Sequence, residues 1–160
     1  MDHILSPGRM KYLKSEKPEG CIFCKKSIRA EDLVLLEGKS CYITMNKYPY
    51  TTGHLMVVPY RHICDMGEMT SEEKIEMMDL ADISIAILKK EMNPEGFNVG
   101  MNLGKASGAG VDCHLHLHIV PRWVGDTNFV TVLGDVRVIP EDIDMTRRIL
   151  LPHFQKSEEV

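Results

Sequence analysis

Apolar and polar residues alternate strictly from position 114 to position 119, and every polar position in this run is a histidine. Strict alternation is typical of a β-strand that buries one face. Because a strand rises about 3.3 Å per residue, side chains two positions apart on one face lie roughly 6.6 Å apart. We therefore expect His114, His116 and His118 to form a ladder on one face. The opposite face would carry Leu115, Leu117 and Ile119, with Pro121 closing the strand.

Other short apolar segments also have the length and the flanking residues of strands. Residues 33–37 and 41–45 are separated by Gly38 and Lys39, which favours a hairpin. Residues 55–58 form a fully apolar segment that ends at Pro59, and residues 97–101 alternate again. Residues 130–138 are rich in β-branched side chains and contain one glycine, which predicts a further short hairpin.

Residues 70–92 have the pattern of a long amphipathic helix. Thr70 and Glu73 match a capping box, and Asn93 followed by Pro94 ends the pattern. Residues 141–154 predict a second, C-terminal helix. The expected core face of the long helix consists of Ile75, Met78, Ala81, Ile85, Leu88 and Met92, widened by Met77, Leu80 and Ile87.

These elements predict an α+β fold with an antiparallel sheet of about five strands, one long helix and a C-terminal helix. Strands that follow one another closely with a single long helix between them favour this class over a βαβ arrangement. Residues 1–20 are polar and lack sustained periodicity, so we expect an N-terminal arm. Residues 21–160 are long enough for one domain with its own core.

Composition narrows the classes of function. The chain has 160 residues, 44% hydrophobic and 26% charged, with a net charge of −4 and no basic stripe, which argues against a nucleic-acid surface. No apolar stretch approaches the roughly 20 residues of a membrane span, and no signal-peptide core is found. We therefore expect a cytoplasmic protein whose five cysteines are reduced or ligate a metal rather than form a disulfide framework.

The histidine ladder indicates a chemical site. Three imidazoles on one strand face would each need polar partners to be buried without cost, which is rare for a purely structural strand. Two kinds of site are open: a group-transfer site, or a metal centre held by all three histidines. The segment from Asn102 to Gly110 precedes the ladder and offers an amide, a lysine, a hydroxyl and flexible backbone, which together favour anion binding.

The ordered motifs of the chain resemble those of the histidine triad (HIT) family of nucleotidyl hydrolases and transferases. The matching features are the histidine ladder, Asn46, the segment from Gly53 and His54 to Pro59, and Asn102 with the glycine-rich stretch up to Gly110. The resemblance covers roughly residues 21–129. Residues 121–129 are most similar to the diadenosine-tetraphosphate phosphorylase branch of that family.

This resemblance implies a role for each candidate residue. His116 would attack phosphorus and carry a nucleoside monophosphate, while His118 would donate to the phosphate oxygens. Asn46 would contact the ribose, and Asn102 a phosphate or the leaving group. Further candidate contacts to phosphate, or to an accepting anion, are Lys105, Ser107, Gly108, Ala109, Gly110, Arg122 and Trp123. Packing is an equally good explanation of Trp123.

The chain departs from the family pattern before the first histidine of the triad. Many members place Gln and then Ser or Thr at the positions held here by Gly110 and Val111. Main-chain N–H groups, or Ser107 and Lys105, would therefore have to supply the contacts to the leaving phosphate.

A second candidate site begins with the Cys-x-x-Cys pair of Cys21 and Cys24. The spacing alone fits a zinc site, a redox pair or core packing. Some members of the family pair such cysteines with two histidines, and the matching positions here are His62 and His114. The resemblance thus implies a structural Cys2His2 zinc site. Cys41, Cys64 and Cys113 are expected to be plain buried residues.

The leading functional hypothesis is a nucleotidyl transferase or hydrolase that acts on dinucleoside polyphosphates, with phosphate or water as the acceptor. The alternatives are a purine nucleoside phosphoramidase and a non-catalytic nucleotide-binding module. The resemblance also implies a homodimer, and neither nucleic acid nor membrane is an expected partner.

Overall fold

The computed structural model describes residues 20–24, 33–107, 111, 113–126 and 142–155. The strands are β1 (Val34–Glu37), β2 (Cys41–Met45), β3 (Leu55–Pro59), β4 (Gly96–Met101) and β5 (Leu117–Arg122). The helices are α3 (Ser71–Met92) and α5 (Ile143–Gln155), with short 3-10 turns η1 (Met66–Glu68) and η2 (Lys105–Ser107).

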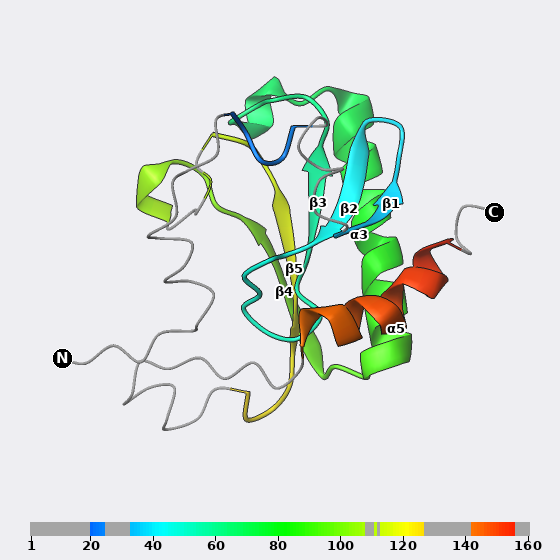
Figure 1. Cartoon of the computed structure of the whole chain (residues 1–160). Coiled ribbons are helices and arrows are strands. Elements are labelled where there is room, and N and C mark those ends of the chain that lie inside the picture. The colour runs from blue at the N-terminus through cyan, green and yellow to red at the C-terminus, as the bar shows by residue number, and fades with distance from the viewer. Residues whose placement is uncertain (1–19, 25–32, 108–110, 112, 127–141, 156–160) are drawn as a thin grey trace.

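The described strands form one antiparallel sheet in the order β1-β2-β3-β5-β4 (Figure 1). The predicted fold class is confirmed: an α+β protein with a five-stranded antiparallel sheet, one long helix and a C-terminal helix. The order places β5 between β3 and β4, in the interior of the sheet. The histidine segment therefore enters the sheet with a neighbouring strand on each side.

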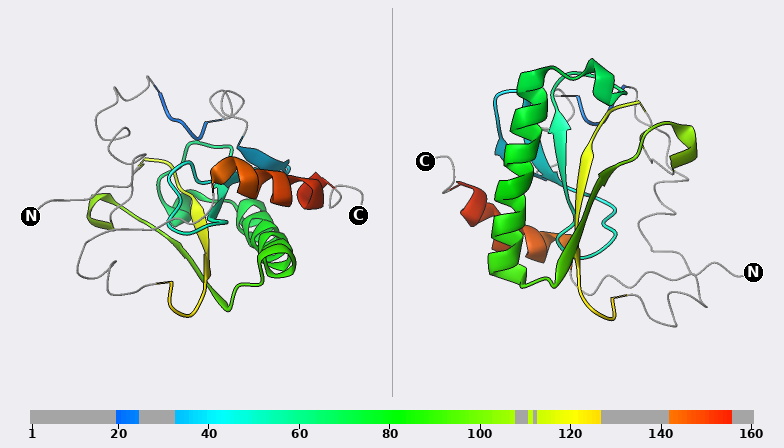
Figure 2. Two further views of the ribbon diagram at one scale, coloured as in Figure 1. Left: turned by 60° about the horizontal axis from the view of Figure 1, so that its bottom comes forward. Right: turned by 180° about the vertical axis from the view of Figure 1, so that it is seen from behind.

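Both helices cover the same face of the sheet, and this face holds the main core. α3 lies lengthwise along the sheet (Figure 2), and α5 packs against α3 and β1. On the opposite face Tyr42, Met56 and Val58 form a smaller apolar cluster. Alternate positions along β2, β3 and β5 contribute the core side chains of this face: Cys41, Ile43, Met45, Leu55, Val57, Leu117 and Ile119. The helices contribute Met77, Leu80, Leu88, Leu150 and Phe154.

α3 begins as predicted, and most of its predicted core face is buried. Thr70 is the N-cap, its hydroxyl accepts from the N–H of Glu73, and Glu73 completes the capping box. Ile75 and Met78 were expected in the core but are 63% and 55% exposed. The rest of the predicted face is confirmed: Met77, Leu80, Ala81, Ile87 and Leu88 are buried, and Ile85 and Met92 pack against the core. Glu73 and Ser84 are buried with them.

Two polar contacts explain why this face of α3 can be buried. The Arg61 guanidinium donates to both carboxylate oxygens of Glu73 at 2.7 and 2.8 Å. The hydroxyl of Ser84 donates to the Leu80 carbonyl at 2.8 Å. Polar side chains whose hydrogen-bonding groups are satisfied in this way cost little to bury.

The strand that carries the triad starts later and ends later than predicted. β5 begins at Leu117, so His114, Leu115 and His116 precede the strand and lie outside the sheet. It also continues through Pro121, which the prediction placed at its end. The pairing of β3 with β5 ends at Ile119, so the missing N–H of Pro121 removes no bond to β3, and Pro121 pairs with Phe97 of β4 instead.

The loop between β2 and β3 passes close to the end of α3 at Gly53. Its φ is +75°, in the region that favours glycine. A Cβ atom there would lie 2.7 Å from the Met92 sulfur and 3.1 Å from a methyl of Leu88. The absence of a side chain thus lets the loop bring His54, the next residue, down onto the sheet.

Some expectations lie outside the described residues. These are the N-terminal arm over residues 1–19 and the hairpin over residues 130–138. The predicted C-terminal helix is confirmed as α5. Within the described part of the chain, no helix has the length and apolar character needed to cross a membrane.

Candidate active site and metal centre

The three histidines of the triad are all buried, with exposed fractions of 2% for His114, 5% for His116 and 7% for His118. His118 pairs with Met56 of β3 on one side and with Gly100 of β4 on the other. Opposite residues of paired strands share a face, so His118 lies on the face of Met56, away from the helices. Leu115, Leu117 and Ile119 belong to the main core, as the alternation predicted.

The ring of His116 is held in one tautomer. Its Nδ1 lies 2.8 Å from the main-chain carbonyl oxygen of His114. A carbonyl only accepts, so Nδ1 carries the proton and Nε2 keeps a lone pair. Burial lowers the pKa of His116, although the bond to the His114 carbonyl acts against this. A neutral imidazole with a free Nε2 is the form that can act as a nucleophile.

A chain of hydrogen bonds also fixes the proton on His118. The main-chain N–H of Tyr50 donates to Nδ1 of His54 at 3.0 Å, so neutral His54 carries its proton on Nε2. That Nε2 lies 2.9 Å from Nδ1 of His118 and donates to it. His118 therefore carries its own proton on Nε2, where it can donate to a ligand oxygen.

Asn102 lies at the donor end of this chain. Its side-chain amide is 3.4 Å from Nε2 of His118. Because His118 is the donor, the amide oxygen is the better partner there, and a half-turn of the amide exchanges its oxygen and nitrogen. Asn102 and His118 thus present polar atoms to the same point.

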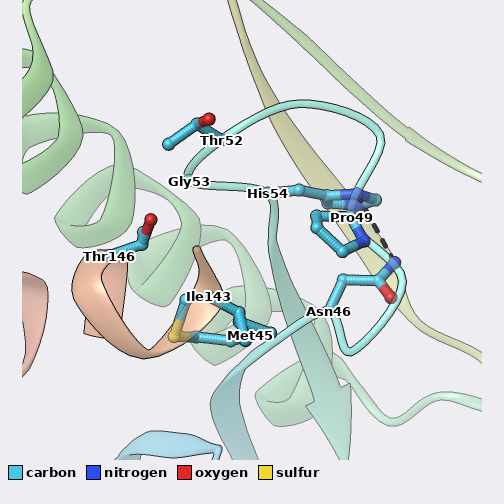
Figure 3. Close-up of a pocket in the computed structure, with 8 residues that line it drawn as sticks. All are labelled: Met45, Asn46, Pro49, Thr52, Gly53, His54, Ile143 and Thr146. Atoms are coloured by element: carbon cyan, nitrogen blue, oxygen red, sulfur yellow. Dashed lines mark hydrogen bonds between the residues drawn. The ribbon is translucent and has the colours of Figure 1, made fainter. Parts of the chain in front are cut away.

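Asn46 is placed beside His54. Its side-chain oxygen accepts from the N–H of Tyr48 at 2.9 Å, and its side-chain nitrogen lies 3.4 Å from Nδ1 of His54. Figure 3 shows this contact at one side of a small pocket between the β2–β3 loop and the start of α5. The lining residues are Met45, Asn46, Pro49, Thr52, Gly53, His54, Ile143 and Thr146.

His54 was missed as a site residue, although its segment was part of the sequence resemblance. It is 1% exposed, and its ring lies against those of Tyr50 and His118, with centroid separations of 4.6 and 5.1 Å. The available signal was a single histidine between a glycine and a fully apolar strand. Such a residue enters the sheet and needs a polar partner there.

Four side chains far apart in the sequence meet near the start of the triad segment. The ligating atoms of Cys21, Cys24, His62 and His114 all lie within 4.8 Å of one another. Nδ1 of His114 is 3.2 Å from the Cys21 sulfur and 3.9 Å from the Cys24 sulfur. Nδ1 of His62 is 3.5 Å from the Cys24 sulfur. The predicted metal-ligand set therefore converges in space.

The geometry and protonation of this cluster fit a zinc ion. With Zn–S near 2.3 Å and Zn–N near 2.0 Å, a tetrahedron separates sulfur and nitrogen ligands by roughly 3.5 Å. Nε2 of His114 lies 2.9 Å from the Pro59 carbonyl and donates to it, so Nδ1 turns a lone pair toward the thiols. Burial raises the pKa of the Cys21 thiol, and a bound cation would favour its thiolate form.

The metal cluster and His116 share one residue. The ring of His114 faces the thiols, and its main-chain carbonyl holds the ring of His116. The next N–H, that of Leu115, donates to the Ile63 carbonyl at 2.7 Å, beside the candidate ligand His62. Displacement of either segment would consequently change both the ligand set and the orientation of His116.

The remaining candidates for phosphate contact are placed only in part. Lys105 and Ser107 belong to η2, where the Ser107 hydroxyl donates to the Gly104 carbonyl at 2.7 Å. The side chain of Lys105 and the residues Gly108, Ala109 and Gly110 lie outside the described part.

The two candidates that follow the triad lie at the other end of β5. Trp123 follows the last residue of that strand and is only partly buried. Arg122 donates from Nε and Nη2 to the two carboxylate oxygens of Asp126 at 2.6 and 2.8 Å, which offsets its charge. This pairing weakens the case for Arg122 as an anion contact.

The expectation that three cysteines are plain buried residues is right for one of them. Cys41 is 0% exposed and belongs to the core. Cys64 and Cys113 are exposed, because each lies in a connection outside the sheet.

Known proteins match the chain over most of its length. The HIT domain family matches residues 28–124. The chain belongs to the HIT family.

A curated relative from Mycobacterium tuberculosis strain H37Rv, named AP-4-A phosphorylase, is 47% identical over 127 residues. That match covers 79% of this chain and 65% of the relative, so the chain spans less than two thirds of that protein. Among solved structures, a zinc-bound histidine triad protein from Mycobacterium smegmatis has a TM-score of 0.69 and 26% identity, over 87% of this chain and 96% of the other. A Plasmodium falciparum diadenosine triphosphate hydrolase has a TM-score of 0.65 and 20% identity, over 94% of each chain, a likeness of fold alone.

We predict that His118 stays neutral well below neutral pH. Burial, followed by the neighbouring His116, lowers its pKa to about 4, whereas a histidine in the unfolded chain titrates near pH 6.5. The unfolded chain therefore binds this proton first, and the contribution of His118 to stability is lost as pH falls from about 6.5 to about 4.

NMR titration of the histidine ring protons measures this pKa, with the His118→Asn variant used to assign the resonance. The His118 shift should stay constant between about pH 7 and pH 5. A midpoint near 6.5 would contradict the hydrogen-bond chain described above.

Proposed function

We propose that this protein is a nucleotidyl transferase that acts on dinucleoside polyphosphates through a covalent His116–nucleoside monophosphate. The observation that carries the proposal is the pairing of two fixed tautomers: a lone pair on Nε2 of His116 beside a proton on Nε2 of His118. The ring centroids of the two histidines are 4.6 Å apart. The relative named AP-4-A phosphorylase supports the choice of substrate.

The first step is attack of Nε2 of His116 on the α-phosphorus of diadenosine tetraphosphate. A P–N bond forms as the P–O bond to the leaving ATP breaks. The imidazole becomes cationic in this step, and its Nδ1–H remains bonded to the His114 carbonyl, which stabilises the positive charge. His118 donates from Nε2 to a phosphate oxygen as negative charge develops.

The second step returns His116 to its starting state. An oxygen of inorganic phosphate attacks the adenylated phosphorus, the P–N bond breaks, and ADP leaves. The same attack by water would give AMP. Asn46 remains the proposed ribose contact and Asn102 a proposed phosphate contact. The proposed anion contacts are Lys105, Ser107, Gly108, Ala109 and Gly110. We propose Trp123 as a wall of the phosphate pocket.

Phosphate should determine the products. Incubation of the full-length protein with diadenosine tetraphosphate and inorganic phosphate should give ADP plus ATP, and with isotopically labelled phosphate the label should appear in ADP. Chromatography with mass detection measures both. If AMP plus ATP form at every phosphate concentration, the protein is a hydrolase; cleavage of P–N substrates alone would identify a phosphoramidase.

Two histidine variants locate the chemistry. His116→Asn should abolish both product patterns while nucleotide binding persists, because an amide is polar but forms no adduct. The matched control is His153→Asn, which changes a histidine on α5 that pairs with Glu91 far from the triad segment in sequence. Full turnover by His116→Asn would refute the covalent route, and binding without turnover in the unmodified protein would indicate a nucleotide-binding module.

We further propose that Cys21, Cys24, His62 and His114 hold a structural zinc ion. All four positions of a tetrahedron are then filled by protein, which leaves no position for a water nucleophile. The convergence of these four side chains supports the proposal, and so does the zinc-bound relative from Mycobacterium smegmatis. This assignment uses the Cys-x-x-Cys pair, which a metal centre made by the three triad histidines would leave unexplained.

Metal analysis should find about one zinc per chain. Cys24→Ser should lose the metal and lower the melting temperature, and chelation should do the same to the unmodified protein. Cys64→Ser is the matched control, since this cysteine is close in sequence to His62 but outside the ligand set, and it should keep its zinc. Retention of zinc by Cys24→Ser would remove Cys24 from the site.

We propose a homodimer joined through β4. This strand pairs only with β5 among the described strands and leaves one edge of the sheet open. Val99 on β4 and Leu103 just after it are 44% and 43% exposed. An open edge with exposed apolar side chains pairs readily with a second copy.

Sedimentation should report a dimer that Val99→Glu converts to monomer. Val124→Glu is the control, because Val124 is 85% exposed but lies outside the strands. A monomeric unmodified protein, or dissociation by Val124→Glu alone, would contradict the interface.

A cytoplasmic location remains a prediction from the sequence.

A further inference from the structure

Two exposed cysteines outside the candidate metal set lie beside each other. The thiol of Cys64 donates to the main-chain carbonyl of Cys113 at 3.1 Å, although the two residues are 49 positions apart. A carbonyl oxygen lies about 2.4 Å from its own Cα, so the Cys64 sulfur is within about 5.5 Å of the Cys113 Cα. Disulfides join cysteines whose Cα atoms are roughly 4.4–6.8 Å apart, so two cysteines brought into contact in this way are candidates for one.

The backbone is anchored on both sides of this pair. A carboxylate oxygen of Glu68 accepts from the N–H groups of Cys64 and Asp65, each at 3.0 Å. Cys113 immediately precedes His114, whose ring is bonded to the Pro59 carbonyl. The segments that carry Cys64 and Cys113 are thus each anchored, and the thiol of Cys64 reaches from one to the other. Rotation of the two side chains is the movement that we expect to bring the sulfurs together.

The other cysteines of the chain are less accessible. Cys41 is completely buried. Cys21 and Cys24 are partly buried and face the two candidate histidine ligands. Thiol oxidation follows exposure as well as thiolate character, so an oxidant in solution meets Cys64 and Cys113 first.

We propose that Cys64 and Cys113 form a redox modification site that closes to an intramolecular disulfide on exposure to hydroperoxides. One thiol attacks the peroxide, its sulfur becomes a sulfenic acid, and the peroxide is reduced to an alcohol or, from hydrogen peroxide, to water. The second thiol then attacks the sulfenyl sulfur, an S–S bond forms and water leaves. The two thiol protons and the two peroxide oxygens leave as water, or as water and the alcohol. A thiol reductant reverses the change.

The disulfide would tie together the two segments that carry His62 and His114. Cys64 lies two residues after His62, and Cys113 lies one residue before His114. The cross-link thus joins the segments that the candidate metal also joins, without using a ligand. Oxidation at this pair should leave the metal in place, unlike oxidation of Cys21 and Cys24. The proposal does not depend on the proposed nucleotide chemistry.

The test uses the full-length, zinc-loaded protein and hydrogen peroxide in small excess. Free thiols are alkylated, the protein is digested without reduction, and peptides are identified by mass spectrometry while a chromogenic chelator reports released zinc. The expected result is a Cys64–Cys113 cross-linked peptide that dithiothreitol removes, with zinc retained. A Cys21–Cys24 disulfide with zinc release, a cross-link between chains, or sulfinic acid without a cross-link would each overturn the proposal.

Single variants identify the partners. Cys64→Ser and Cys113→Ser should both abolish the cross-link, and the remaining thiol should be trapped by dimedone as a sulfenic acid. Cys41→Ser is the matched control and should leave the cross-link unchanged. A cross-link that persists in Cys113→Ser would assign the reaction to another thiol and refute this pair.

Discussion

The hydrogen bond from Nε2 of His114 to the Pro59 carbonyl is the contact on which the site depends. It joins the end of β3 to the approach to β5, and it decides which nitrogen of His114 faces the two thiols. The same residue supplies the carbonyl that orients His116. His114 thus orients a candidate metal ligand through its ring and fixes the tautomer of His116 through its carbonyl. Removing the bond would leave a buried carbonyl without its partner as well as a histidine free to turn.

The three histidines of the triad are buried, and burial favours their neutral form. Burial lowers the pKa of His114, His116 and His118 alike. Each ring has a defined donor or acceptor, so the protons are placed by geometry and not by net charge. The net charge of −4 does not argue against an anionic ligand, because such a ligand would meet oriented N–H groups at this site. The proton of His54 is placed in the same way, because the main-chain N–H of Tyr50 donates to its Nδ1.

Much of the fold could be predicted because its strands are short, apolar and bounded by glycine or proline. β2 was predicted with its observed bounds, and the capping residues located the start of α3. The exposure of Ile75 and Met78 could not be predicted, because both follow the apolar periodicity of α3. The burial of Glu73 depends on its pairing with Arg61 from another segment. The start of β5 was misplaced because the alternation of the sequence begins at His114, whereas pairing with the neighbouring strands begins only at Leu117. The metal set was predicted by resemblance, whereas His54 became visible only once β3 and β5 were placed side by side.

Gly53 shows how far the requirements of the site reach. It touches no candidate ligand and carries no chemical group, yet the end of α3 occupies the space where its Cβ would lie. Added bulk there would lift the loop and withdraw His54 from His118, which would release the proton placement of a ring more than sixty positions along the chain. Tolerance to substitution in this protein therefore need not follow distance from the reacting atoms. A position with nothing to contribute except empty space can be as constrained as the proposed nucleophile.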